Sequence, residues 1–304
     1  MLALPSLGRL RSGERGGRDL LRNQPNLLGA LHFMSLNMRI ATTVINARVV
    51  RRAIWTSAPA GFRHCHSRSS VQPAAAYHQQ STMAPKIIYF PVRGRAEVMK
   101  LAIVASGDDF ELEQVNFQDM KAHPELYPFG QCPRLVDGDN DMVQSNAIIR
   151  YLGRKYGLYG KSEKETIAVD EILEGVESLR CKYLTLIYQD QLATKDAYWT
   201  SHGDPASVDS RNGGAHLLYF SRLLARNKEA GGGGGKAFVG SGLTLADLAV
   251  YDIVDLHVRI FGDQMQAAYP DLLSFHSAIS ELPGIKDYLA SPRRLAAVNG
   301  NNLG

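Results

Sequence analysis

The chain has 304 residues, 45% of them hydrophobic and 21% charged, a balance typical of a globular protein with room for two domains. No stretch approaches the roughly 18 uninterrupted apolar residues that a membrane span needs. The net charge of +4 comes from residues 1–83, which hold 11 arginines, no lysine and two acids, so the rest carries 23 basic and 28 acidic residues. A mildly acidic body argues against nucleic acid as a partner.

The Arg-rich segment, residues 1–83, has the composition of a mitochondrial or chloroplast transit peptide. The alternative is an extension ahead of a start at Met83. We therefore expect this segment to be a disordered transit peptide or extension. The location would be mitochondrion or chloroplast in the first case and cytoplasm in the second.

Cysteine and histidine usage limits the site chemistry. Only Cys132 and Cys181 lie outside the Arg-rich segment, so no disulfide framework is possible there. Cysteines and histidines show no metal-ligand spacing, and we predict no metal site.

Two strands and a helix are predicted first. Residues 86–90 form an apolar run ended by Pro91, which indicates a strand. Residues 95–106 have apolar positions at helical spacing, and residues 110–117 alternate as a second strand does.

A hairpin and a helix follow. Residues 133–137 and 141–144 flank Asp-Gly-Asp-Asn, a strong turn signal. Ser145 would cap a helix running to about Tyr156. The order β-α-β then β-β-α predicts a small mixed sheet against helices, an α/β domain at residues 84–158.

Strand signals stop after Gly160. Residues 163–188 form one long helical pattern, and three or four further helical segments follow. Thr244 and Asp247 have the spacing of a capping box, with the carboxylate reaching back to the Thr244 amide. We predict an all-helical domain at residues 164–304.

Four features could carry chemistry. Tyr89 ends a strand that leads into a helix N-terminus, where an anion is favoured. Pro133 directly precedes a strand, and a cis proline there would turn the backbone of Cys132 outward.

The other two features are Gln144-Ser145, at a helix start with free amides, and Tyr188 near the end of the long helix. Each alone has a structural explanation, because a strand tyrosine is usually packed and Gln-Ser-Asn is an ordinary helix start.

Together and in this order, the features resemble the glutathione transferases, specifically their pi class. The resemblance covers nearly all of residues 85–304. The matching segments are Tyr-Phe-Pro-Val-Arg-Gly-Arg at 89–95, Gln-Ser-Asn at 144–146, Leu-Tyr-Gly-Lys at 158–161, Leu-Arg-Cys-Lys-Tyr at 179–183, Leu-Ile-Tyr at 186–188, the capping box and Leu-Ala-Ser-Pro at 289–292.

This resemblance implies a thioredoxin-like domain, an all-helical domain and a homodimer. It also implies conjugation of glutathione, the co-substrate, to hydrophobic electrophiles in detoxification, with no metal. Tyr89 would donate its hydroxyl to the glutathione sulfur. A free thiol has a pKa of ~8.5, so a positioned donor makes the reactive thiolate available. Arg95 would be a supporting cation that orients Tyr89.

The remaining roles also follow from the resemblance. Glutathione would contact Lys121, Gln131, the Cys132 backbone set by Pro133, Gln144 and Ser145. The electrophile pocket would be walled by Phe90, Val92 and Tyr188. Phe129 would be the aromatic key inserted into the partner subunit.

Three positions depart from the class. Ser178 stands where the class has an Asp that reaches across the dimer, so glutathione binding should be weaker unless Glu177 substitutes. The loop after Phe117 is shorter and lacks the class tryptophan, which leaves Lys121 to meet the glycyl carboxylate. Cys132 replaces an apolar residue and is either an inert thiol or one able to form a mixed disulfide.

Three other functions share part of this pattern. A thiol oxidoreductase of this fold needs a cysteine at the start of the first helix, and residues 92–96 contain none. An isomerase that uses glutathione as cofactor would share the tyrosine and differ only in its pocket. A carrier or structural relative would not need Tyr89, Arg95 and Gln131 together.

Overall fold

The computed structural model describes residues 83–208 and 214–304. Our prediction for residues 1–83 therefore lies outside the described residues, apart from Met83.

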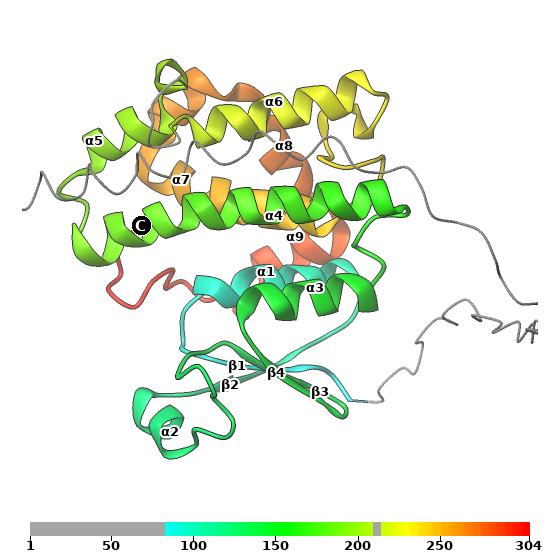
Figure 1. The fold of residues 1–304 in the computed structure, drawn as a ribbon, viewed down its shortest axis with the longest axis vertical. Coiled ribbons are helices and arrows are strands. Elements are labelled where there is room, and N and C mark those ends of the chain that lie inside the picture. Colours follow the sequence, from blue (N-terminus) through cyan, green and yellow to red (C-terminus); the bar gives the residue numbers. More distant parts are fainter. Residues whose placement is uncertain (1–82, 209–213) are drawn as a thin grey trace, which may run out of the picture. The chain divides into compact units, whose positions relative to one another are not determined.

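The first part of the described chain contains a four-stranded mixed sheet (Figure 1). Its strands are β1 (Lys86–Tyr89), β2 (Glu111–Gln114), β3 (Arg134–Asp137) and β4 (Asn140–Val143). The order is β2-β1-β3-β4, with β1 parallel to β2 and the other two pairs antiparallel. The hairpin prediction is confirmed, because Asp137 pairs with Asn140 across a two-residue turn.

Helices cover both sides of this sheet. A short helical turn, η1 (Gly94–Ala96), leads into α1 (Glu97–Ala105), and α3 (Ser145–Lys155) follows β4. Both α1 and α3 lie between the sheet and the helical part, whereas α2 (Phe117–Ala122) lies on the far side (Figure 1). All of α1 except its last residue is buried, because it packs on the sheet below and on helices above.

Two details of the first part differ from the prediction. The second strand ends at Gln114, and Phe117 instead begins α2, whose N-terminus is closed by an Asn116–Asp119 capping box. Ser145 is the first residue of α3 and not its cap; Gln144 holds the cap position with a φ of 74° and makes no side-chain capping bond.

The second part of the described chain is helical. Its main helices are α4 (Glu163–Leu184), α6 (His216–Glu229), α7 (Leu245–Ala268), α8 (Pro270–Ser280) and α9 (Pro283–Ala290). The short elements are α5 (Lys195–Tyr198), two wide turns, η2 (Thr185–Gln189) and η3 (Trp199–Gly203), and two tight turns, η4 (Pro205–Ser207) and η5 (Gly233–Gly235). The long helix thus ends at Leu184, and Tyr188 lies in the wide turn that continues it.

The start of α7 is fixed by the predicted box. Asp247 is fully buried, and its carboxylate accepts hydrogen bonds from the Thr244 amide at 2.7 Å and the Thr244 hydroxyl at 2.8 Å. The other carboxylate oxygen accepts from the Phe238 amide at 2.7 Å. The motif therefore anchors the preceding loop as well as the helix.

The predicted fold class, a small mixed sheet with helices followed by a helical domain, is confirmed. The boundaries at 84–158 and 164–304 stay a prediction, because buried side chains of both parts join in one continuous core. In particular, α1 packs against α7 and α9.

Candidate active site

Tyr89 ends β1 and is 7% exposed. Its hydroxyl oxygen accepts a hydrogen bond from the Arg95 amide at 3.1 Å. Gly94 makes this approach possible: its φ is +41°, and a Cβ there would lie 2.6 Å from the Tyr89 hydroxyl oxygen. Burial raises the pKa of Tyr89 above its ordinary value, so the hydroxyl keeps its proton at neutral pH and can donate it.

The guanidinium of Arg95 points to a different partner. Its two terminal nitrogens donate to the Glu177 carboxylate at 3.0 and 2.8 Å, and one lies 3.5 Å from the Ser145 hydroxyl. Arg95 therefore hydrogen-bonds Tyr89 through its backbone, whereas its cation acts on the phenol by charge alone and lowers the pKa of Tyr89 less than burial raises it. Burial alone would raise the pKa of Glu177, but the hydrogen bond and charge of Arg95 hold it below its ordinary value.

Strand register brings three predicted residues to one edge of the sheet. Ile88 pairs with Arg134, so the next residues in register, Tyr89 and Pro133, lie side by side. Arg134 in turn pairs with Val143, which places Gln144 next to Pro133 on the other side. The Cys132–Pro133 peptide bond is cis. Tyr89, the residues before β3 and the start of α3 thus meet at this edge.

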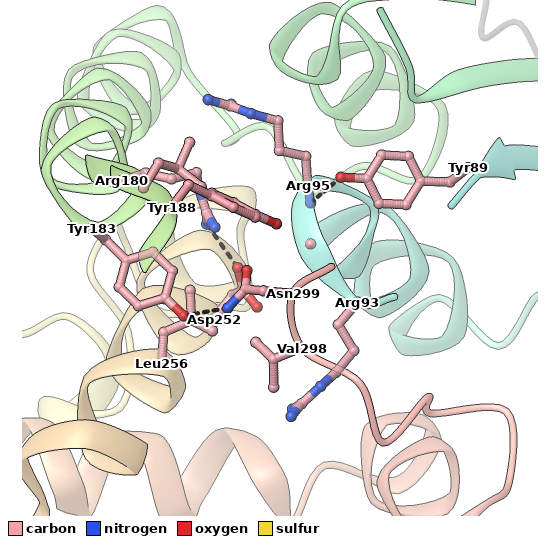
Figure 2. A pocket seen from close by; sticks show the side chains of 12 residues that line it. Tyr89, Arg93, Arg95, Arg180, Tyr183, Tyr188, Asp252, Leu256, Val298 and Asn299 are labelled. Carbon is pink, nitrogen blue, oxygen red and sulfur yellow. Dashed lines mark hydrogen bonds and ion pairs between the residues drawn. The ribbon is translucent and has the colours of Figure 1, made fainter. Parts of the chain in front are cut away.

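A cavity of about 210 Å³ opens beside Tyr89 (Figure 2). It is lined by Tyr89, Arg93, Gly94, Arg95, Arg180, Tyr183, Leu184, Tyr188, Asp252, Leu256, Val298 and Asn299. Tyr188 is a lining residue, as predicted. Phe90 and Val92 are not, and Phe90 packs against Phe117 with ring centroids 5.0 Å apart.

The cavity lining mixes apolar and charged side chains. Arg180 and Asp252 form a buried ion pair at 2.7 Å in this lining (Figure 2). Neither residue was predicted to have a role, although Arg180 lies in a matching segment. Charged residues inside helices look like surface positions in a sequence, so only the packing of α4 on α7 could reveal the pair.

The last residues of the chain close the cavity. The Gly94 amide donates to the Val298 carbonyl at 3.0 Å, and the Asn299 side chain donates to the Tyr183 hydroxyl at 2.8 Å. The Gly300 amide donates to the Tyr188 hydroxyl at 3.2 Å. The C-terminal segment is therefore part of the site.

Comparison with known proteins agrees with this arrangement. Residues 85–154 match the family model for the glutathione S-transferase N-terminal domain, and residues 179–292 match that for the C-terminal domain. Glutathione S-transferase P of Bos taurus is 36% identical over 219 residues, which cover 71% of this chain and 96% of that protein. The chain belongs to the glutathione S-transferase family.

Other relatives of the family support the pi-class resemblance. Glutathione S-transferase 2 of Onchocerca volvulus is 35% identical over 222 residues, covering 72% of this chain and 99% of that protein. The solved structure of the Onchocerca volvulus pi-class glutathione S-transferase has 32% identity and a TM-score of 0.62, covering 73% of this chain and all of that one. The glutathione S-transferase of Ascaris lumbricoides gives 27% identity and a TM-score of 0.54, over 68% and 97% of the two chains. The chain is thus a transferase of this family.

Within the transferase site, the other predicted glutathione contacts differ in exposure. Gln131 and Gln144 are exposed, Pro133 is buried, and Lys121 is exposed on α2. Cys132 is half-buried, and burial raises the pKa of its thiol to about 11. A thiol with so high a pKa is almost wholly protonated at neutral pH, which favours the inert interpretation over a mixed disulfide.

No group of three or more His, Cys, Asp or Glu side chains in residues 83–208 and 214–304 could hold a metal ion. In the same ranges, no helix has the length and apolar character needed to cross a membrane.

Proposed function

We propose that this transferase conjugates the thiolate of glutathione to hydrophobic electrophiles, with Tyr89 holding the thiolate. The observation that carries the proposal is a buried, protonated Tyr89 hydroxyl that accepts from the Arg95 amide and faces a partly apolar cavity. Because its oxygen already accepts a bond, its proton is directed outward. A donor of this kind lowers the pKa of a thiol from ~8.5 and increases the thiolate fraction at neutral pH.

In the proposed reaction, the glutathione thiol releases its proton to solvent and the thiolate accepts a hydrogen bond from Tyr89. The sulfur then attacks the electrophilic carbon, and an aryl halide loses its halide ion. The tripeptide would lie along the sheet edge, against the Cys132 backbone and Gln131, with its γ-glutamyl end at Gln144 and Ser145. Lys121 is the proposed contact of the glycyl carboxylate.

The electrophile would occupy the cavity beside Tyr188. Because the Tyr188 oxygen accepts from the Gly300 amide, its own proton is free to bond charge that develops on the substrate. Phe90 and Val92 remain proposed contacts for substrates that extend beyond the cavity.

The experiment compares conjugation of glutathione to an aryl halide by the full chain and by Tyr89→Phe. We expect kcat/KM to fall by about 100-fold, the usual effect of losing one charge-stabilising donor. Tyr156→Phe, which removes a hydroxyl bonded to Asp108 away from the site, should change the rate by less than about twofold. A fall of less than about threefold in Tyr89→Phe would overturn the assignment of the activating group.

We also propose a homodimer in which Phe129 inserts into the partner. The role of Phe129 follows from the family resemblance, and its 64% exposure leaves the ring available to a partner subunit. Phe129→Ser should yield a monomer at micromolar concentration in analytical ultracentrifugation. Phe117→Ser is the matched control, because Phe117 is 66% exposed on α2 and has no proposed interface role. A Phe129→Ser protein that stays dimeric would refute the role of Phe129.

A further inference from the structure

A single carboxylate on α7, that of Asp255, contacts two arginines. Asp255 Oδ2 lies 3.2 Å from a terminal nitrogen of Arg93 and 2.9 Å from one of Arg294, while Oδ1 lies 3.2 Å from His276 Nε2. All of these side chains are largely buried, with Arg93 only 7% exposed. Asp255 is therefore the shared anion of two buried cations.

The two arginines belong to the two segments that border the cavity. Arg93 lies in the loop between Tyr89 and η1, and its amide donates to the Ala297 carbonyl at 2.9 Å. Arg294 begins the C-terminal segment, residues 294–299, which supplies Val298 to the cavity. Asp255 thus joins the loop between Tyr89 and η1, here called the Tyr89 loop, to the C-terminal segment.

The contact between the Tyr89 loop and the C-terminal segment depends on the negative charge of Asp255. Burial would raise the pKa of Asp255, but the His276 hydrogen bond and the charges of Arg294 and Arg93 hold it below its ordinary value, so the anion persists. Without that anion, Arg93 and Arg294 would lie close together with Glu97, whose carboxylate is 3.3 Å from Arg294 Nε, left to offset their charge. Loss of the Asp255 contact would leave Arg93 more poorly paired, because its Nε is already buried without a hydrogen-bond partner among the described residues.

We propose that Asp255 is a positioning residue for the electrophile pocket: it keeps residues 294–299 docked on the Tyr89 loop and so sets the affinity for the electrophile. The inference rests on the proposed conjugation reaction at the same site. The side-chain partners of Asp255 are Arg93, His276 and Arg294, and none of these is assigned to glutathione. Glutathione affinity should accordingly be independent of it.

The kinetic test uses Asp255→Asn in the full chain. We expect the KM for the aryl halide to rise about tenfold, while kcat and the glutathione KM stay within about threefold. Arg294→Gln should change the electrophile KM in the same direction, because it removes the Arg294–Asp255 contact together with the Arg294–Glu97 contact. The double variant should fall short of the sum of the two, because the Arg294–Asp255 contact is shared. The control is Glu281→Gln, which breaks the exposed Glu281–Lys286 pair in the same domain without effect on either KM.

A second readout does not need activity. Hydrogen exchange of the Arg93 and Gly94 amides, which donate to residues 297 and 298, should accelerate at least about tenfold in Asp255→Asn and in Arg294→Gln. If Asp255→Asn does not fold, Arg294→Gln decides both measurements. Unchanged exchange, or faster exchange with an unchanged electrophile KM, overturns the inference. If the variants exchange faster but the parent protein itself shows no conjugation, the proposed function is overturned, whereas the role of Asp255 in docking residues 294–299 still stands.

Discussion

The Arg95 amide donates to the Tyr89 hydroxyl oxygen over 3.1 Å, while the guanidinium of the same residue binds Glu177. The backbone amide and the side-chain guanidinium of Arg95 therefore have different partners. The amide orients the phenol, and any residue other than proline supplies that amide. The cation is bound to a half-buried carboxylate next to Ser145, where the γ-glutamyl end of glutathione is proposed to lie.

Arg95→Ala should raise the glutathione KM about tenfold, because it leaves the Glu177 carboxylate unpaired beside an anionic ligand. The apparent pKa of the kcat/KM profile should stay within about 0.5 unit, since the amide that holds Tyr89 is retained. Steady-state kinetics from pH 5.5 to 8.5 measures both. Adding Glu177→Ala should restore part of the affinity, and a shift of the apparent pKa by more than about one unit would show that the cation itself favours the thiolate.

Ser178→Asp should tighten glutathione binding about threefold. Ser178 is exposed on α4, its hydroxyl donates to the Glu174 carbonyl, and an added carboxylate would attract the γ-glutamyl ammonium across the proposed dimer. Isothermal titration of glutathione measures the dissociation constant. Ser178→Asn has a similar shape without the charge and should bind as the parent does. An unchanged constant in Ser178→Asp would mean that no such cross-dimer contact forms.

Asp247→Ala should lower the free energy of unfolding by about 3 kcal/mol. The change removes a helix cap and strands the buried Phe238 and Thr244 amides, each of which bonds the carboxylate at 2.7 Å. Urea denaturation measures the loss. The control is Asn116→Ala at the exposed cap of α2, expected to cost about 1 kcal/mol. If Asp247→Ala and Asn116→Ala lowered the free energy of unfolding equally, the prediction that Asp247 contributes more to stability would be wrong.

His216→Phe should make the stability of the protein less dependent on pH. Burial lowers the pKa of His216 to about 4, and burial likewise lowers that of His257 to about 4. Such rings are neutral when folded but bind a proton when unfolded below pH ~6.5, so stability is lost as the pH falls from about 6.5 to 4. The buried Nδ1 of His216 has no partner among the described residues, so phenylalanine should be tolerated at pH 7.

Urea denaturation at pH 7 and at pH 5 tests this prediction. A histidine that binds its proton only when unfolded costs at most about 1.4 kcal/mol per pH unit in this range, and the half-buried His216 costs less because solvent screens it. The His216→Phe protein should therefore lose less stability on acidification than the parent. His123→Gln changes an exposed ring and should behave as the parent does. The same loss in His216→Phe as in the parent would exclude His216 as a source of acid sensitivity.

Several elements could be predicted because their signals are local. The Asp-Gly-Asp-Asn turn indicated the β3–β4 hairpin, and the Thr244–Asp247 spacing indicated the start of α7. The helix α2 was not predicted, because it has only six residues and shows no apolar periodicity. Its N-terminus is instead marked by a polar capping box of Asn116 and Asp119. That box was the signal that could have found it.

The sequence by itself determined the local elements on which Tyr89, Pro133 and Gln144 stand, because strand, turn and helix-start signals are local. The family resemblance then assigned these residues to glutathione. That they lie side by side follows from the register of β1 with β3 and of β3 with β4, which the structure shows.

Only the tertiary structure decided how the charged side chains pair. Asp255 lies 162 positions from Arg93 and 39 from Arg294, and all three look like surface residues in the sequence. Apolar periodicity records which face of a helix is buried, but it carries no information on which distant cation a carboxylate will meet. That choice depends on where α7, the Tyr89 loop and the C-terminal segment converge, since an ion pair forms between whatever opposite charges the packing brings together.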